Sequence, residues 1–402
     1  MAQKSSRAVF DSLLTKTHVQ HALIQPDGRH NEIPGALATL LFLGATPDRL
    51  EAAYASIKDD LGPWEPSPRS IADEETKERF LGDARFQRAF MSYFSMENGM
   101  FSSNPKTLAL SHLFSGPQPL LAGLFSSVGR PLALLADGIE LRAALLLMQS
   151  LTLCAVDFPV SFHDLLTHPP ATPPPLSSLF PPEDLIGLAA YDGRLSGVMK
   201  AGPGFHGASH IFASAAARAA LGEYLWRLDA RDEARLLQQL AALAALLLAA
   251  THKPAHPAFD LYLARLVTCV NSVRVLLELP WVEEPAQRGL LVRGLWLVVL
   301  VVYITQLRPV IDGKLLVSRE LAEEQRGWEG LWEAAGVGEE GTEERFGRGE
   351  LLRALRSLSE LAKRYGAVHG RLYFHAAWKL VGQWEGWTGL GIDREVMLNI
   401  RL

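Results

Sequence analysis

Apolar residues along this chain recur at the spacing of helical faces and seldom alternate with polar residues. Runs of alternating β-branched and aromatic residues bounded by turn signals are scarce, which argues against strands. The pattern therefore predicts an all-α fold without a parallel sheet. The predicted helices span residues 35–43, 47–61, 77–99, 107–113, 120–134, 138–157, 183–188, 207–228, 233–250, 259–277, 285–306 and 350–365.

One of these helices has a clear local start signal at Thr46-Pro47-Asp48. The threonine hydroxyl can accept a hydrogen bond from an open amide of the first turn. Proline suits the first helical position, because its missing donor has no partner there in any case. A helix is therefore expected to begin at Pro47.

The proline-rich segment HPPATPPPLSSLFPP, from His168 to Pro182, interrupts the helical pattern near the middle of the chain. Each proline removes a backbone donor and fixes φ, so neither a helix nor a sheet continues through it. Two readings stay open: a surface loop within one domain of residues 1–402, or a connector between lobes 1–167 and 183–402. A second break, residues 336–349, is acidic and rich in glycine.

The most membrane-like stretch is LWLVVLVVYI, from Leu295 to Ile304. It falls short of the roughly 20 apolar residues that cross a bilayer. Residues 236–250 are similarly apolar but include two glutamines. Both stretches are predicted to be buried helices, and no membrane span is expected.

The amino-acid composition limits which binding partners and which cellular compartment are expected. The 402 residues are 48% hydrophobic, enough for a large core, and the net charge of -5 gives no positive field to attract a phosphate backbone, so nucleic acid is not expected. The two cysteines, Cys154 and Cys269, lie in apolar runs without CxxC spacing, as buried thiols in a reducing compartment would. The N-terminus lacks the apolar run of a signal peptide, so cytoplasmic localisation is expected.

No common catalytic motif in the sequence identifies a reaction. No GxGxxG follows a predicted strand, and neither a phosphate-binding GxxxxGK(S/T) loop nor the GxSxG of hydrolases occurs. His206 and His210 stand four apart, a spacing that places two imidazoles on one helical face, as a metal site requires. No acidic residue completes an HExxH motif, so a helix start with satisfied or exposed histidines is the other reading.

Three segments resemble motifs of the questin oxidase-like family, in the family's order. They are HNEIPGALATLLFLGATPDRLEAAY from His30, FSSVGRPLALLADGIEL from Phe125 and FDLYLARLVTCVNSVRVLLELPWV from Phe259. RALRSL from Arg353 is a possible fourth. The resemblance spans most of the chain. It implies a large helical bundle around an enclosed apolar pocket, and enzymes that oxidise aromatic polyketides with iron held by histidines and a carboxylated lysine.

Most of the family's ligand positions carry other residues in this chain. His30 matches the first histidine, whereas the following histidine pair falls on Gly35 and Ala36. The two histidines of an HPLIH-type segment fall on Arg130 and Leu134. Two further positions also differ: Arg265 replaces the histidine of the third motif, and the lysine segment falls near Arg293.

This exchange argues against the family's iron site. A guanidinium is permanently charged and has no lone pair to offer a metal. The arginines could instead balance acids such as Glu140, Asp137 or Asp260, or donate hydrogen bonds to a substrate carbonyl. Simple ion pairs that fill the space of a lost metal are the other reading.

The leading hypothesis is an enzyme of natural-product biosynthesis that needs no metal or redox cofactor. It would fold a polyketide or terpenoid intermediate in an apolar pocket for cyclisation, cycloaddition of the Diels-Alder type, or isomerisation. The predicted catalytic residues are His30, Arg130, Arg265 and Glu140, and the predicted substrate-binding residues are Leu134, Asn271, Trp296 and Tyr303. The expected partner is a small apolar substrate, with a homodimer possible.

Two other hypotheses remain. The chain could be an oxidoreductase of the family type, with iron held by a rearranged set such as His30, His206 and His210. It could also be a non-catalytic binding protein whose pocket is filled by side chains.

Overall fold

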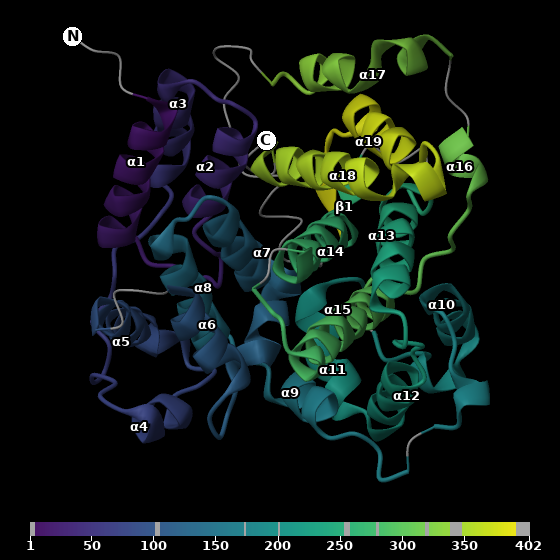
Figure 1. The fold of residues 1–402 in the computed structure, drawn as a ribbon, viewed down its shortest axis with the longest axis horizontal. Coiled ribbons are helices and arrows are strands. Elements are labelled where there is room, and N and C mark those ends of the chain that lie inside the picture. Colours follow the sequence, from purple (N-terminus) through teal and green to yellow (C-terminus); the bar gives the residue numbers. More distant parts are fainter. Residues whose placement is uncertain are drawn as a thin grey trace. The chain divides into compact units, whose positions relative to one another are not determined.

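The computed structural model describes residues 5–100, 105–172, 174–199, 202–252, 258–278, 281–317, 321–337 and 348–390. Across these residues the chain is almost wholly helical, with one small sheet (Figure 1). The predicted all-α class is therefore confirmed.

The chain divides into two compact units, each described here by itself. Unit 1 comprises residues 1–163, 275–283 and 336–353. In it α1, α2 and α3 pack against one another, and α8 packs against α5 and α7. Its elements, with η for 3-10 helices, are α1 (Ser6–Gln20), α2 (Ile33–Phe42), α3 (Pro47–Lys58), α4 (Glu74–Arg79), η1 (Ala84–Phe86), α5 (Gln87–Met100), α6 (Pro105–Phe114), η2 (Leu120–Phe125), α7 (Ser126–Glu140) and α8 (Ala144–Val156).

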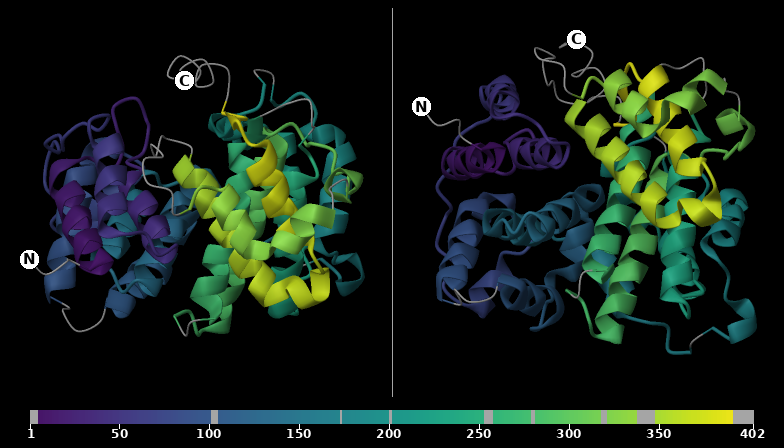
Figure 2. Two further views of the ribbon diagram at one scale, coloured as in Figure 1. Left: turned by 90° about the horizontal axis from the view of Figure 1, so that it is seen from above. Right: turned by 45° about the horizontal axis from the view of Figure 1, so that its top comes forward.

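Unit 2 comprises residues 164–274, 284–335 and 354–402. In it α13 packs against α15 and α19, and α19 also packs against α17 (Figures 1 and 2). Its elements are η3 (Leu176–Ser178), α10 (Pro182–Tyr191), η4 (Gly193–Leu195), η5 (Phe205–Gly207), α11 (Ala208–Ala213), α12 (Ala215–Trp226), α13 (Glu233–Ala249), β1 (Ala258–Asp260), α15 (Pro285–Thr305), α16 (Lys314–Val317), α17 (Leu321–Ala334), α19 (Leu372–Gln383) and β2 (Gly386–Thr388). Three helices contribute residues to both units: α9 (Val160–Thr167), α14 (Leu261–Glu278) and α18 (Arg348–His369).

The small sheet was not predicted. Strands β1 and β2 pair in parallel over three residues each, with Phe259 opposite Trp387. Such short strands leave no alternating pattern long enough to detect in the sequence.

Local start signals account for several helices. The Thr46 hydroxyl accepts from the backbone N–H of Arg49 at 3.4 Å and Pro47 opens α3, so the predicted start is confirmed. Helix α1 was not predicted. It buries only Val9, Phe10, Leu13, Leu14 and Thr17, and so narrow an apolar stripe is a weak sequence signal.

The predicted breaks between helices were less accurate. Residues 77–99 do not form one helix, because the chain turns at Gly82, whose φ is +80°. Residues 207–228 are divided at Ser214, whose hydroxyl caps α12 by accepting from Ala217 N at 3.3 Å. The predicted helices 120–134 and 138–157 left a break at residues 135–137, but the structure is helical there. It is interrupted instead at residues 126–129 and at residues 141–143, where Arg142 has a φ of +51°.

Two helical stretches are long and apolar enough to cross a membrane by length and composition alone. They are Leu120–Glu140 and Pro285–Thr305, each of 21 residues, so the argument that the most apolar run is too short was wrong. Within the fold, 89% and 78% of their most apolar windows are buried.

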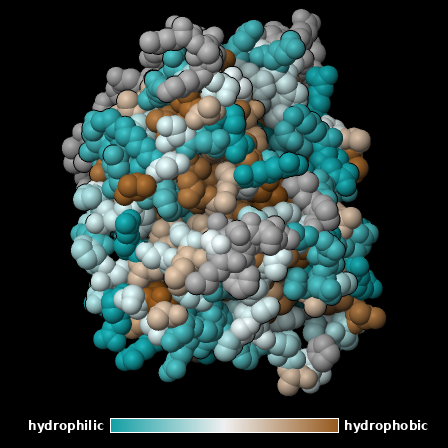
Figure 3. Space-filling view, turned by 60° about the vertical axis from the view of Figure 1, so that its left-hand side comes forward, coloured by the Kyte–Doolittle hydropathy of each residue, from teal (hydrophilic) through white to brown (hydrophobic). Residues whose placement is uncertain are grey.

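Exposed apolar side chains are spread along the sequence. They include Val19, Val160, Tyr191, Val310 and Val368. On the face shown in Figure 3, hydrophilic side chains predominate and apolar ones form separate patches. Singly exposed apolar residues of this kind are ordinary on protein surfaces.

Helix α8 carries an unusual polar residue in the core of unit 1. Gln149 is fully buried, and neither its amide nitrogen nor its amide oxygen has a hydrogen-bond partner among the described residues. The next residue, Ser150, is equally buried but donates to the carbonyl of Pro131 at 2.7 Å. An unpaired buried polar group costs about 1–3 kcal/mol. The unpaired amide of Gln149 therefore lowers the free energy of unfolding, whereas the hydrogen bond of Ser150 raises it.

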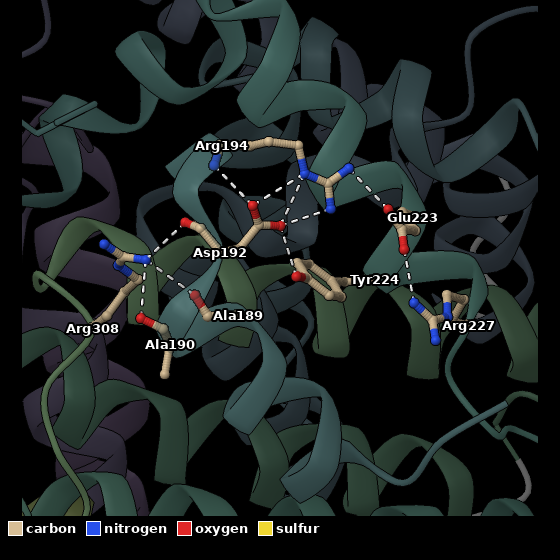
Figure 4. Close-up of polar contacts among 8 residues, drawn as sticks. All are labelled: Ala189, Ala190, Asp192, Arg194, Glu223, Tyr224, Arg227 and Arg308. Carbon is tan, nitrogen blue, oxygen red and sulfur yellow. Dashed lines mark hydrogen bonds and ion pairs between the residues drawn. The ribbon is translucent and has the colours of Figure 1, made fainter. Parts of the chain in front are cut away.

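In unit 2 an arginine closes the C-terminal end of α10. Arg308 Nη1 donates to the carbonyls of Ala189, Ala190 and Asp192 at 3.2, 3.1 and 3.1 Å (Figure 4). These are carbonyls that the end of a helix leaves without intrahelical partners. A cation is also favoured there by the helix dipole.

The same region holds a network of ion pairs around Asp192 (Figure 4). Its carboxylate accepts from Arg194 Nη2 and from the hydroxyl of Tyr224, both at 2.7 Å. Glu223 pairs with Arg194 at 2.9 Å and with Arg227 at 2.7 Å. The hydrogen bonds from Arg194 and Tyr224 lower the pKa of Asp192 to about 2.

We predict that Gln149→Met raises the free energy of unfolding by about 1–3 kcal/mol, because it removes two unpaired polar atoms and keeps a straight side chain of similar size. Urea denaturation followed by tryptophan fluorescence measures this. The matched control is Ser150→Ala on the same helix, which should lower stability by about 1 kcal/mol. Equal losses in both variants would contradict the absence of partners at Gln149.

We also predict a pH-dependent effect of Asp192→Asn. The pKa of Asp192 is lower in the folded chain than in the unfolded chain, where it is about 4. The ionised carboxylate therefore stabilises the fold above about pH 4, and this stabilisation is lost as the pH falls towards 2. The stability lost in the variant should therefore be about 1 kcal/mol at pH 7, allowing for solvent screening, and should shrink below pH 4. Asp229→Asn, which removes a more exposed pair with Arg231, should cost less. A loss that is equal at pH 7 and pH 3 would contradict the assignment.

Candidate functional site

Charged side chains in unit 1 join the start of α2, helix α7 and the first two turns of α18. Arg130 and Asp137 stand seven residues apart and therefore share a face of α7. Glu350 and Arg353 stand three apart and share a face of α18, and Glu32 is the residue at which α2 begins. These five side chains form the charged cluster of the candidate site.

Arg130 lies between two carboxylates. Its Nη2 atom pairs with Glu32 at very short range and with Glu350 Oε1 at 3.3 Å. The three side chains are only 11%, 19% and 13% exposed, so the charges depend on one another for solvation. The expected pairing of an arginine with an acid is found, but Glu32 and Glu350 were not among the acids predicted to make it.

Arg353 makes the second ion pair of the cluster. Its Nη2 atom donates to Asp137 Oδ2 at 2.9 Å and to the carbonyl of Gly35 at 2.7 Å. The guanidinium also lies directly over the Cα of Gly35, where an added Cβ would collide with it. A side chain at position 35 would therefore have to displace the guanidinium of Arg353, and an imidazole there would occupy the same space.

Beside the charged cluster, a serine links a histidine to an aspartate. Ser127 Oγ donates to Asp157 Oδ2 at 2.6 Å and lies 3.1 Å from His30 Nε2. A hydroxyl has one proton, so when it is given to Asp157 the oxygen must accept from His30 Nε2. Burial raises the pKa of Asp157, and the hydroxyls of Ser127 and Ser126 oppose that rise.

The backbone that carries Ser127 is strained. Ser127, Val128 and Gly129 are consecutive left-handed residues, with φ/ψ of 46/40°, 54/55° and 70/22°. Val128 is β-branched and 1% exposed, so it cannot relax into solvent. Left-handed residues normally occur singly, and each unfavourable one costs on the order of 1–3 kcal/mol. The surrounding fold holds Ser127 in place at that cost.

No local sequence pattern marks Ser127, Asp157, Glu350 or Arg353 as site residues. Their partners lie between 30 and 318 positions away, so the pairs exist only in the folded chain. The one local hint is Gly129 followed by Pro131, which marks an interruption within the predicted helix.

Two more of the predicted site residues, Leu134 and Glu140, also lie on α7. Leu134 is 5% exposed, one turn after Arg130. Glu140 is the last residue of α7 and is half-buried. The predicted roles of both stay predictions.

The other predicted site residues belong to unit 2. The guanidinium of Arg265 lies 5.8 Å from the ring centroid of Tyr262, one turn earlier on α14. Asn271 is buried on the same helix and accepts from Arg274 Nε at 3.1 Å. Their roles towards a substrate also stay predictions.

The two aromatic residues predicted to bind substrate are core residues of α15. Trp296 is fully buried, and its indole N–H donates to the carbonyl of Tyr224 at 3.0 Å. Tyr303 is 2% exposed, and burial raises its pKa. Their packing inside unit 2 is what helical aromatics commonly provide.

The donor atoms at the family's ligand positions do not fit an iron ion. Gly35 and Ala36 offer none, Leu134 is a hydrocarbon, and Arg130 is a cation. Arg293, near the lysine position, has no amine to carboxylate, and its guanidinium lies 5.1 Å from the ring centroid of Trp226. Among the described residues, no three histidine, cysteine, aspartate or glutamate side chains converge on one point.

The rearranged histidine set is only partly described. His206 lies in η5, and its side chain is outside the described part of the structure. His210 lies on α11 and is exposed. His30 belongs to unit 1, whereas these two belong to unit 2.

We predict that Gly35→Ala lowers the free energy of unfolding by about 1–3 kcal/mol, because the new Cβ must displace the buried guanidinium of Arg353 from Asp137. Thermal and urea denaturation measure this loss. The matched control is Gly187→Ala in α10, where nothing lies near the added Cβ. That variant should gain up to about 1 kcal/mol from helix propensity. A stabilised Gly35→Ala protein would contradict the packing of Arg353.

Comparisons with known proteins agree with the motif resemblance. A family model described as questin oxidase-like matches residues 29–344. Over 147 residues the chain is 26% identical to a questin oxidase of Aspergillus terreus (strain NIH 2624 / FGSC A1156), covering 35% of this chain and 32% of that protein. The chain is thus matched to about a third of that relative's length. Both findings point to an enzyme, and the chain belongs to the questin oxidase-like family.

Proposed function

We propose that this chain is an enzyme of secondary metabolism that works without the family's iron, converting an apolar polyketide or terpenoid intermediate by cyclisation, cycloaddition or isomerisation. The observation that supports the proposal is the set of residues at the positions to which the motif resemblance assigns iron ligands, where Gly35 and Ala36 have no donor side chain and Arg130 stands in place of a histidine. The Arg130 guanidinium, held by Glu32 and Glu350, has no lone pair to offer a metal ion. It can still polarise a substrate carbonyl.

Arg130 is the proposed hydrogen-bond donor to the substrate. Its Nη2 atom is engaged by the two carboxylates, whereas its Nε atom is buried and has no hydrogen-bond partner among the described residues. A fixed donor in a low-dielectric site stabilises charge that develops on an oxygen in the transition state. The flanking carboxylates hold the guanidinium still, so little reorganisation is needed when the charge appears.

His30 is the proposed proton-exchanging residue. Because Nε2 donates to Ser127, the neutral imidazole presents its lone pair at Nδ1. It could then remove or return a proton on carbon or oxygen, as an isomerisation or an aldol-type cyclisation requires. A cytoplasmic enzyme with a small apolar substrate and no cofactor is part of the same proposal.

The alternative is an oxidase. It is favoured by one observation, the similarity of part of the chain to a protein named questin oxidase. The two functions differ in atom balance: cyclisation, cycloaddition and isomerisation conserve the mass of the substrate, whereas an oxygenase adds oxygen.

The product mass tests this proposal. The substrate is taken as the compound that accumulates when the gene is deleted in the producing organism. We expect the purified chain to convert it to an isomer in the presence of a chelator, as seen by mass spectrometry, with well below one iron per chain by elemental analysis. A product heavier than the substrate by added oxygen, and formed only with stoichiometric iron, would overturn the proposal in favour of the oxidase.

We predict that Arg130→Lys lowers kcat for this conversion by at least about tenfold, because lysine can keep the ion pairs with Glu32 and Glu350 but has no atom equivalent to Nε. The control is Arg194→Lys in the surface network of unit 2, which should keep its turnover. Unfolding measured on both variants separates a loss of donor from a loss of fold. Unchanged turnover in Arg130→Lys would remove Arg130 from the mechanism.

A further inference from the structure

Ser127 has surroundings that the proposed function uses only to orient His30. Its oxygen lies between a carboxylate at 2.6 Å and an imidazole nitrogen at 3.1 Å. The hydroxyl proton points to Asp157, so this carboxylate is the group placed to accept it. His30 Nε2 donates to the same oxygen and can keep this hydrogen bond after that proton has left.

The strained turn gives a second, independent observation. Three consecutive left-handed residues present Ser127, and the middle one is a buried valine that strongly disfavours this backbone. Strain of this kind persists where the surrounding structure requires it, and it gathers at functional sites. Hydrolases of the GxSxG type also hold their serine on a strained turn. This chain has no GxSxG, so its sequence concealed the arrangement.

We propose that Ser127 is a nucleophile and that unit 1 carries an acyl-transfer site for small neutral esters and lactones. Ser127 Oγ attacks the carbonyl carbon, and its proton passes to Asp157. The bond from the carbonyl carbon to the alcohol oxygen breaks, and the leaving oxygen takes the proton from Asp157. Water then attacks the acyl-serine, Asp157 takes a proton from the water, and Ser127 regains its proton when the acid is released.

Each neighbour has a stated part in this reaction. The net change is ester plus water to acid plus alcohol, so no oxidant or reductant is needed. The hydrogen bond from His30 Nε2 to Ser127 Oγ holds the serine oxygen in a fixed direction for the attack. The raised pKa of Asp157 makes its carboxylate a stronger base than an exposed aspartate. Arg130, three residues further along the chain, adds positive charge on the same segment.

A covalent probe tests the proposal without knowledge of the natural substrate. The full chain is incubated with a fluorophosphonate probe and, separately, with p-nitrophenyl butyrate. We expect one adduct per chain, located at Ser127 by peptide mass spectrometry, and a burst of p-nitrophenol close to one equivalent. Asp157→Asn should slow labelling by at least about tenfold, because the group that accepts the proton is lost.

The variant Ser127→Gly removes the hydroxyl and also relieves the strain, because glycine tolerates positive φ. It should therefore fold at least as stably as the parent chain while losing both the adduct and the burst. Ser111→Ala on α6 is the matched control, since Ser111 donates only to the carbonyl of Leu108 within its own helix, and it should keep both signals.

Absence of the adduct at Ser127 in folded protein, or a burst that persists in Ser127→Gly, would overturn the proposal. These outcomes are separate from those of the proposed cyclisation or isomerisation. That reaction has no acyl-serine, so it would give an isomer of the substrate without any adduct at Ser127. Labelling at another residue would likewise count against Ser127 and not against the metal-independent function.

Discussion

The candidate site depends on the need of buried positive charge for a partner. Arg130 and Arg353 are each about nine-tenths enclosed, and removing a partner from such a pair commonly costs 3–5 kcal/mol. Their carboxylates come from three separate segments, so the pairs fix the start of α2 and the first two turns of α18 against α7. In the proposed function, the same pairs hold the Arg130 guanidinium in place to polarise a substrate oxygen.

Much of the architecture followed from the sequence, because helices are encoded locally. The start of α3 was predicted from Thr46 and Pro47, and the extent of α15 from its apolar run and flanking residues. Breaks were harder to predict, since Gly82 and Arg142 reverse the chain through positive φ that no apolar pattern reveals. The all-α class and family membership were predicted correctly, whereas the division of the chain into lobes stays a prediction.

The site was predictable only in part. The replacement of histidine by Arg130 is visible in the sequence once the motif is aligned, but its partners Glu32 and Glu350 are 98 and 220 residues away. Ser127 was overlooked because its importance comes from three backbone angles and two distant side chains. Trp296, chosen for its aromatic ring, packs in the core of unit 2, and its role towards a substrate stays a prediction.

The contact between Gly35 and Arg353 also limits how this sequence can change. A side chain at position 35 collides with the guanidinium, and loss of the guanidinium first would leave Asp137 without its ion pair. Neither single change is therefore neutral, and the two positions are coupled by epistasis. A side chain at position 35 and a smaller residue at position 353 are tolerated more easily together than one at a time.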